Sequence, residues 1–476
     1  MELQITISNF KSISSVNLTL KEGLNVLIGP NGSGKTCLLT ALQFLRDLFL
    51  FGAAQAMAKN GGTKRIYRRG AKTISFLISH SYGDRLYRRR KRPCQFNWEI
   101  KISQTGKAGI ANIEYEKANI VASVDGKEKI LFEVTVDRTR LSRIRPKVFL
   151  CGVDQFGRDL FSRWEQLFEG NTKEQIYVDF RKKILRDLSV KLKRAIDESV
   201  FPRLAEFDRE LESLYSLFSY LNEYNVAPDI ARQSTEQLPF AQMQPNGAGV
   251  SEVIHALLHR NFERIELGRY YGIPRYAGYD FYDWGIPYRR YAPYYRPRLF
   301  GYGRDYERKT LTQALQNINR ELSAAVKPIE SIDVDTDPTN GRRFVVFHTG
   351  KEKFSPEEVS DGTIKWLCIL VSIFVPFSSV YILEEPENFL HPWMQQRLIQ
   401  MMRDHAKSNH TVFILASHSS TVLNATTPDE VMVVSSTDDG TKIVEIEDKE
   451  AIEQALTKSN FRLGDYWVSG AFGGVP

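Results

Sequence analysis

The feature that most constrains this chain is a glycine-rich segment of eight residues near its beginning. Residues 29–36 read GPNGSGKT, which matches the pattern GxxxxGK[ST] in full. A short apolar run, Leu24–Ile28, precedes the segment, and a long apolar stretch without proline, Thr36–Phe49, follows it. We expect a strand buried on both faces, a tight loop and a buried helix, which is the context that this pattern requires. The segment therefore predicts an α/β fold.

The same loop has the chemistry of a phosphate-binding site. Its glycines allow backbone N–H groups to close around phosphate oxygens, and the N-terminus of the following helix adds partial positive charge. We expect Lys35 to reach the β and γ phosphates of ATP and Thr36 to ligate Mg²⁺. The residues predicted to bind the nucleotide here are Asn31, Gly32, Ser33, Gly34, Lys35 and Thr36.

Acidic and basic side chains follow two apolar runs in the second half of the chain. Val380–Leu383 predicts a buried strand, and Glu384 and Glu385 come directly after it. Carboxylates at a strand end near the loop can hold Mg²⁺ and polarise an attacking water. The run Val412–Leu415 leads to His418, which can sense a γ-phosphate. Upstream, residues 359–363 read VSDGT before a predicted helix, a weak signal that alone indicates only a helix cap.

The order of these motifs resembles the ABC-type ATPase heads of the SMC, RecF and OLD-like group. The shared order is P-loop, long insertion, SDGT, a strand with EEPExxLHP and a strand with ASHS, and ISNFKSI at residues 7–13 resembles the group's opening. The resemblance covers residues 1–50 and 350–425, and the middle only in layout. It implies an ABC-ATPase head, that is, a P-loop NTPase with a β-rich lobe and a helical insertion between the P-loop and the signature motif.

The resemblance also implies a role for the SDGT segment. Ser360, Asp361 and Gly362 would form the signature that contacts the γ-phosphate of ATP bound to a partner protomer. The sequence reads VSDGT where the group's usual signature is LSGGQ, as in many OLD-like heads.

Four further residues take roles from the resemblance. Glu384 would hold the Mg²⁺-side acid position, Glu385 would be the general base, and His418 would be the switch histidine. Gln155 follows a predicted strand and is our candidate for the Q-loop glutamine. Glu384 replaces the usual aspartate, which moves the carboxylate about 1.5 Å further out. Contact with Mg²⁺ through water stays feasible, and we expect slow hydrolysis.

The chain divides into three predicted parts. Residues 1–160 form an N-terminal ATPase lobe with the P-loop and a β-rich subdomain, residues 161–330 form a helical insertion, and residues 331–476 form a C-terminal lobe with the signature, acidic strand, switch histidine and tail. We expect a helix over 251–266 with Ser251 as its N-cap. The β-rich strands are predicted at residues 74–78, 96–102, 110–115, 130–136 and 148–150.

Two basic runs lie in the β-rich region. They contain Lys64, Arg65, Arg68, Arg69 and Lys72 in the first run, and Arg85, Arg88, Arg89, Arg90, Lys91 and Arg92 in the second. Clustered arginine favours phosphate, so nucleic acid is one candidate ligand for Arg65, Arg68, Arg69, Arg88, Arg89 and Arg90. A protein partner and a solvated hairpin edge are the alternatives.

An aromatic segment lies inside the predicted insertion. Residues 269–308 hold 11 of the 21 tyrosines and 8 arginines. Both residue types are enriched at protein interfaces, which favours a partner or assembly surface. Base stacking on nucleic acid and packing against the head are the alternatives.

Composition narrows the cellular setting. The formal net charge is +7, which permits nucleic-acid contact without demanding it. The four cysteines form no CxxC pair, which favours a reducing compartment. The N-terminus lacks the pattern of a signal peptide, and Trp366–Phe377 is too short to span a bilayer, which takes about 20 residues. We expect a cytoplasmic protein with no membrane partner.

The motif set also resembles stand-alone ATPase subunits of bacterial anti-phage systems of the PARIS, Septu and retron-associated types. The 58 residues after His418 show no TOPRIM nuclease pattern, so we expect a separate effector, a nuclease or toxin. The predicted function is an ATPase, slow in turnover, that forms a homodimer or larger oligomer around ATP and Mg²⁺ and controls that effector. The alternatives are a RecF-like DNA-binding repair ATPase and a structural ATP-binding assembly with little turnover.

Overall fold

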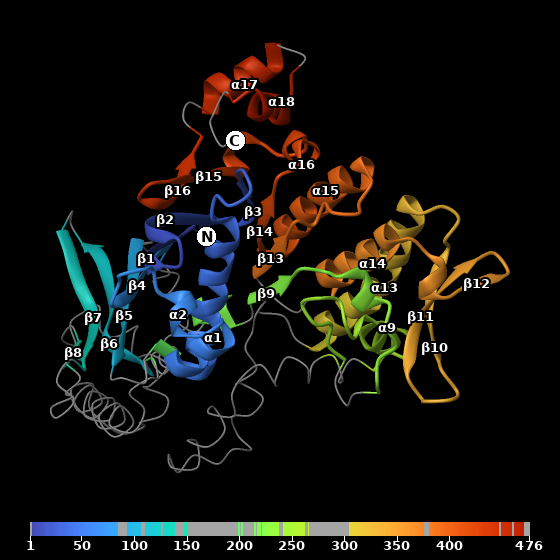
Figure 1. Ribbon diagram of the computed structural model, residues 1–476, viewed down its shortest axis with the longest axis horizontal. Helices are drawn as coiled ribbons and strands as arrows, with labels where there is room; N and C mark the ends of the chain where they lie inside the picture. Colours follow the sequence, from blue (N-terminus) through green and yellow to red (C-terminus); the bar gives the residue numbers. More distant parts are fainter. Residues whose placement is uncertain are drawn as a thin grey trace. The chain divides into compact units, whose positions relative to one another are not determined.

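The computed structural model describes most of the chain in segments. These are residues 2–83, 93–105, 110–124, 127–138, 147–150, 199, 201–202, 214–215, 217–219, 221–237, 241–261, 265, 304–375, 380–446, 449–458 and 461–470. The chain forms two compact units from interleaved segments (Figure 1). Unit 1 contains Met1–Lys21, Cys37–Phe218 and Ser436–Ile443, and unit 2 contains Glu22–Thr36, Ser219–Ser435 and Val444–Pro476. The three-part division predicted from sequence stays a prediction.

Unit 1 is built on an antiparallel sheet of seven strands in the order β2-β1-β4-β5-β6-β7-β8. The strands are β1 Glu2–Phe10, β2 Ile13–Lys21, β4 Thr73–Gly83, β5 Pro93–Thr105, β6 Ile110–Val124, β7 Lys127–Asp137 and β8 Lys147–Leu150. Leu3, Ile5 and Ile7 are fully buried and alternate with more exposed residues, because successive side chains of a strand point to opposite faces. This confirms the β-rich lobe, with longer strands than predicted.

Helix α1, Lys35–Lys59, follows the P-loop and is interrupted at Gly52, whose φ is 80°. In unit 1 its Phe44 ring stacks on Phe76 of β4, with 5.8 Å between centroids. Among the described residues, α1 is the one helix long and apolar enough to cross a membrane, and 67% of its most apolar window is buried within the protein. Burial of this kind is also found in the core helix of a globular domain. The short helix α2, Thr63–Ile66, comes next.

Unit 2 contains the sheet that positions the predicted site, with strand order β15-β3-β14-β13-β9. The strands are β3 Gly23–Ile28, β9 Leu221–Tyr224, β13 Val380–Glu384, β14 Val412–Ser417 and β15 Val431–Thr437, while β16 Gly440–Glu445 has most of its residues in unit 1. Strands β9, β13, β14, β3 and β15 run parallel. Ile28 of β3 is in register with Ser417 of β14, and Ala416 with Glu384 of β13. The three motif strands therefore end at one edge of the sheet, as ligand sites of open α/β sheets do.

The remaining elements of unit 2 are helices and one small sheet. The helices are α8 Pro228–Ala231, α9 Val250–Leu258, α13 Arg304–Ala325, α14 Asp361–Phe374, α15 Pro392–Asn409, α16 Ser420–Asn424, α17 Lys449–Lys458 and α18 Leu463–Val468, with 3₁₀ turns at Pro356–Glu358 and Pro428–Glu430. An antiparallel sheet contains β10 Ser331–Thr336, β11 Arg343–Thr349 and β12 Glu352–Phe354. Most of the predicted insertion lies outside the described residues, and α8, α9 and α13 are its described helices in this unit.

One cap prediction is wrong and another is right. Helix α9 begins at Val250 with Gly249 as its N-cap, so Ser251 is a buried residue of the first turn rather than the cap. The backbone decides this, since Gly249 has φ 82° and a Cβ there would lie 2.5 Å from the carbonyl oxygen of Gln242. At α14 the predicted start is confirmed, because Ser360 is the N-cap and its side chain accepts from the Thr363 N–H.

Candidate functional site

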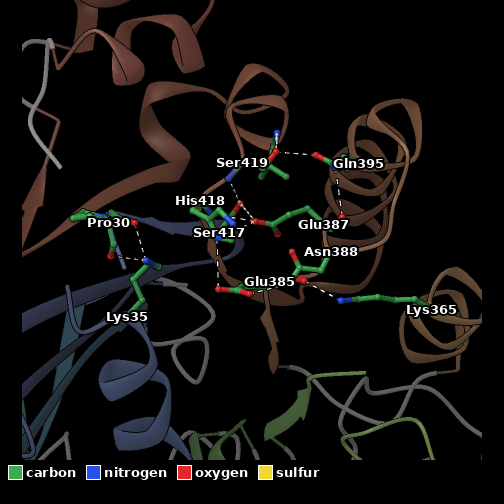
Figure 2. Close-up of polar contacts among 12 residues, drawn as sticks. Pro30, Lys35, Lys365, Glu385, Glu387, Asn388, Gln395, Ser417, His418 and Ser419 are labelled. Atoms are coloured by element: carbon green, nitrogen blue, oxygen red, sulfur yellow. Dashed lines mark hydrogen bonds and ion pairs between the residues drawn. The ribbon is translucent and has the colours of Figure 1, made fainter. Parts of the chain in front are cut away.

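The P-loop connects β3 to α1 in unit 2 and folds back over itself. Lys35, the first residue of α1, has an ammonium that donates to the carbonyl oxygens of Gly29 at 2.7 Å and Pro30 at 3.0 Å (Figure 2). Only 7% of Lys35 is exposed. Burial lowers the pKa of this ammonium, and the carboxylates of Glu385, Glu387 and Glu384 oppose that shift. The Lys35 ammonium therefore lies at the P-loop, where three glutamate carboxylates act on it electrostatically.

Four loop residues show why this sequence is required. A Cβ at Gly29 would lie 2.0 Å from the carbonyl oxygen of Val434, so no larger residue fits. Gly32 and Gly34 have φ values of 80° and 106°, which glycine adopts without strain. The Ser33 hydroxyl is buried and has no hydrogen-bond partner among the described residues. A phosphate oxygen would supply that partner, so the loop fits a nucleotide.

Thr36 and Glu384 meet where β3 and β13 end. The Thr36 hydroxyl donates to one carboxylate oxygen of Glu384, and the Asn225 side-chain amide donates to the other at 3.4 Å. A hydroxyl and a carboxylate are hard oxygen ligands, and Mg²⁺ in such sites uses one or two of them beside phosphate oxygens. Among the described residues no three His, Cys, Asp or Glu side chains gather as a metal site. Thr36 and Glu384 are thus the residues that would hold Mg²⁺ together with the nucleotide.

Asn225 was not predicted from sequence. It follows β9, a strand of four residues, LNEY, with no clear periodic signal. Its importance comes from topology, since β9 lies next to β13 in parallel register and so ends beside Glu384. The candidate Q-loop residue Gln155 lies outside the described residues, as do Arg88, Arg89 and Arg90.

Glu385 has a left-handed backbone with φ 44°, which is uncommon for a residue other than glycine. Its N–H donates to the carbonyl oxygen of Ala416 at 2.9 Å, and its own carbonyl accepts from the Lys365 ammonium at 3.0 Å. The Asn388 amide donates to its carboxylate at 2.8 Å, and Nδ1 of His418 lies 3.5 Å from the other carboxylate oxygen (Figure 2). Contacts with Ala416, Lys365, Asn388 and His418 therefore fix the position of Glu385, the predicted general base.

Glu387 is the last acid of the EEPE segment, and the sequence assigned it no role. Its Oε1 accepts from the Ser417 hydroxyl at 2.6 Å and from the His418 N–H at 3.1 Å. The residue is 5% exposed, and Oε2 has no partner among the described residues. Gln395 of α15 links the segment after β13 to the segment after β14. Its side-chain amide donates to the Glu387 carbonyl at 3.4 Å, and its side-chain oxygen accepts from the Ser419 hydroxyl at 2.8 Å. Glu387 thus holds His418 beside Glu385.

Lys365 is a second buried cation, after Lys35, near Glu385 and Glu387. The sequence analysis did not predict it. It lies on α14, is 3% exposed, and has its ammonium 5.7 Å from the centre of the Phe389 ring. Burial lowers the pKa of Lys365, while the carboxylates of Glu387 and Glu385 raise it. No sequence pattern marks this lysine, which is brought to the acids by the helix that begins at the signature.

The predicted signature residues lie together at the start of α14. Ser360 caps the helix, and a Cβ at Gly362 would lie 2.5 Å from the carbonyl oxygen of Phe389, so glycine is needed where the signature meets the segment after Glu385. Asp361 pairs with Arg232. The structure thus joins the signature to the acidic strand through Phe389.

In unit 1, part of the first basic run is hydrogen-bonded to the turn between β1 and β2. The Arg68 N–H donates to the Asn9 carbonyl at 3.0 Å and the Lys11 N–H to the Ile66 carbonyl at 2.7 Å. Arg65 and Arg69 are exposed, whereas Arg68 is half-buried.

The parallel sheet, the P-loop at the end of β3 and the acids at the end of β13 define an α/β P-loop nucleotide-binding protein. The chain belongs to the AAA-domain family, because a family model described as "AAA domain" matches residues 4–244, about half of the chain. A second model, described as "AAA domain, putative AbiEii toxin, Type IV TA system", matches residues 270–424. The α/β P-loop class predicted from sequence is confirmed.

Curated relatives match over short stretches. A stretch of 46 residues is 52% identical to the DNA replication and repair protein RecF of Shewanella denitrificans, covering 10% of this chain and 13% of that protein. A stretch of 63 residues is 35% identical to the DNA double-strand break repair Rad50 ATPase of Methanopyrus kandleri, covering 13% of this chain and 7% of that protein. The chain therefore spans only a small part of the length of these relatives.

Solved structures match over most of the chain at low identity. The SMC head domain from Thermotoga maritima is 12% identical with a TM-score of 0.36, and the match covers 94% of this chain and all of that one. An SMC head bound to the C-winged helix domain of ScpA is 13% identical with a TM-score of 0.43, covering 94% of this chain and 98% of that one.

Proposed function

We propose that the protein is an Mg²⁺-dependent ATPase with slow turnover. The arrangement of Glu385 and His418 carries this proposal. Nδ1 of His418 lies 3.5 Å from the carboxylate of Glu385, the proposed base, and the next residue, Glu384, accepts a hydrogen bond from Thr36. Lys35 binds the β and γ phosphates, and Glu385 accepts the proton of the attacking water. Mg²⁺ supplies charge neutralisation between the phosphates. Slow turnover follows from the longer Glu384 side chain, which places its carboxylate where Thr36 already engages it.

The test of ATP binding uses Lys35→Ala in the full chain. Removing the cation should abolish binding of a fluorescent ATP analogue, while Lys353→Ala, an exposed lysine of the same unit, should not change it. Unchanged affinity in Lys35→Ala would contradict the P-loop assignment.

We further propose that ATP joins two or more copies, with Ser360, Asp361 and Gly362 of one copy meeting the nucleotide of another. Support comes from the exposed, capped start of α14 and from the resemblance of its sequence to a signature. The Glu385→Gln protein should retain ATP and self-associate in its presence. Light scattering with ATP and with ADP tests this, and a monomer under both conditions would contradict it.

We also place the protein in the cytoplasm as the sensor or scaffold of an anti-phage system with a separate effector. The match of residues 270–424 to a model described with a toxin system supports this setting. The purified chain with ATP and Mg²⁺ should cut neither DNA nor RNA. Robust cleavage that survives Glu385→Gln would overturn the proposal of a separate effector.

A RecF-like DNA-binding ATPase is the second candidate function. The exposed Arg65 and Arg69 beside the β1–β2 turn favour it, since such a cluster suits a phosphate backbone. Stimulation of ATP hydrolysis by duplex DNA, lost in Arg65→Gln/Arg69→Gln and weakened by salt, would support it over the effector model. A structural assembly that binds ATP with little turnover is the third candidate function. Release of ADP in a single-turnover assay would favour either of the other two candidates over it.

A further inference from the structure

The guanidinium of Arg232 binds the segment that leads into α14. Its Nη1 donates to the carbonyl oxygens of Pro356 and Val359, the latter at 2.8 Å, and its Nη2 donates to the Asp361 carboxylate. The Arg232 side chain is 11% exposed, whereas that of Asp361 is 46% exposed. One buried cation thus holds three acceptors within six consecutive residues.

Arginine is suited to this position by its geometry. The planar guanidinium presents several donors in a fixed fork, so it can satisfy two backbone carbonyls and one carboxylate at once. A lysine has a single charged atom and cannot reach the three acceptors in the same way.

Arg232 itself is held in place by packing. It follows α8, and its N–H donates to the carbonyl oxygens of Pro228 and Ile230. A Cβ at Gly247 would lie 2.8 Å from the Ala231 side chain and 3.3 Å from Sγ of Cys368 on α14, so this segment packs tightly against the signature helix. The guanidinium therefore does not depend on a free loop for its position.

The charge of Asp361 gives the contact a second consequence. Asp361 is the first residue of α14, where a carboxylate stabilises the helix dipole. The proposed function brings a phosphate to the same helix end, and two anions at one place repel each other. The usual signature, LSGGQ, has glycine at this position, so the charge that Asp361 adds must be neutralised here.

We propose that Arg232 is a positioning residue of the signature. It fixes the backbone from Pro356 to Asp361 and neutralises the Asp361 carboxylate, so that the N-terminus of α14 can accept a phosphate of the nucleotide bound to a second copy of this chain. This inference rests on the proposed ATP-dependent self-association.

The test uses the full chain in the Glu385→Gln background, with ATP-dependent self-association measured by sedimentation velocity. Arg232→Met should weaken association roughly 10- to 100-fold, as expected for loss of one partner of a hydrogen-bonded charge pair. Adding Asp361→Asn to Arg232→Met should recover at least part of that loss, since the unpaired anion is removed. Arg342→Met is the matched control, because Arg342 pairs with Glu236 at 2.9 Å and both side chains are exposed.

Recovery of association in the double variant would show that Arg232 acts by neutralising the Asp361 carboxylate. If Arg232 only anchored the backbone, Asp361→Asn could not restore association. Full association in Arg232→Met, or no rescue in the double variant, would overturn the inference and leave the proposed function standing. If Arg232→Met does not fold, Arg232→Lys decides: it keeps the charge but loses the fork, so association weakened more than about threefold supports the inference and association equal to that of the parent overturns it. If the Glu385→Gln protein binds ATP and stays monomeric, the proposed ATP-dependent self-association is contradicted. The inference about Arg232 is then contradicted as well, because it rests on that self-association.

Discussion

The Lys365 ammonium lies 3.0 Å from the backbone carbonyl oxygen of Glu385, the residue with φ 44°. A buried cation thus holds an unfavourable backbone conformation from a helix that begins at the signature. The carboxylate of the same residue lies 3.5 Å from Nδ1 of His418. The contact gives the first of four predictions.

Lys365→Met should slow ATP hydrolysis roughly 10- to 100-fold, because a misplaced base loses the geometry of attack. Nucleotide affinity should stay within about threefold of the parent, since the Lys365 ammonium bonds the backbone of Glu385 and Lys365 is not part of the P-loop at residues 29–36. Steady-state kinetics and equilibrium binding provide the two measurements. Lys353→Met, whose exposed ammonium pairs with Asp335, is the control. Unaltered turnover in Lys365→Met would show that Glu385 keeps its position without the lysine.

Glu385→Gln and Glu384→Gln should differ in phenotype. The first keeps its shape and loses its basicity, so ATP stays bound while hydrolysis falls roughly 10²–10⁴-fold. The second weakens the acceptor of Thr36 and should raise the Mg²⁺ concentration needed for half-maximal activity. Single-turnover assays over a Mg²⁺ titration distinguish them. The reverse pattern would exchange the two roles.

Asn225→Ala should raise the Mg²⁺ requirement in the same direction as Glu384→Gln but by a smaller factor. The amide holds one carboxylate oxygen of Glu384 at 3.4 Å, so its removal loosens the acid without removing charge. The same Mg²⁺ titration checks this, with Asn340→Ala, on an exposed turn, as the control. A Mg²⁺ requirement equal to that of the parent would leave Asn225 without a role at the metal.

His405 should make the protein lose stability in mild acid. Burial lowers its pKa to about 4, from 6.5, and its ring packs against Phe413. The unfolded chain binds a proton below pH 6.5 and the folded chain does not until about pH 4, so stability falls between these values by about 3 kcal/mol.

Chemical denaturation at several pH values measures this dependence. His405→Leu should flatten the curve between pH 6.5 and 4, and His410→Leu, an 81% exposed side chain, should not. An unchanged acid slope in His405→Leu would assign the loss of stability to other groups.

Much of the parallel sheet follows from local sequence. Val380–Leu383 and Val412–Leu415 are apolar throughout and Leu24–Ile28 is apolar apart from Asn25, as suits strands buried on both faces, and each forms a strand of unit 2. The Ser360 cap was readable for the same local reason, whereas Ser251 failed because the glycine turn before it sets the helix start.

The contacts that complete the site were not readable in this way. Asn225, Arg232 and Lys365 act through neighbours more than 15 residues away in the sequence, and a lone asparagine, arginine or lysine gives no periodic signal. Only the parallel register of β9 beside β13 and the packing of α8 on α14 bring them to the acids and the signature.

The place of β3 in its sheet has a consequence for synthesis. This strand is made within the first 28 residues, yet both of its neighbours, β14 and β15, begin after residue 411. At about 5–20 residues per second, the ribosome leaves β3 without partners for roughly 20–80 s. A bare apolar strand is a template for wrong pairing during that interval. The nascent chain must therefore shield the P-loop strand, and the proposed nucleotide site can form only after the last seventh of the chain begins to emerge.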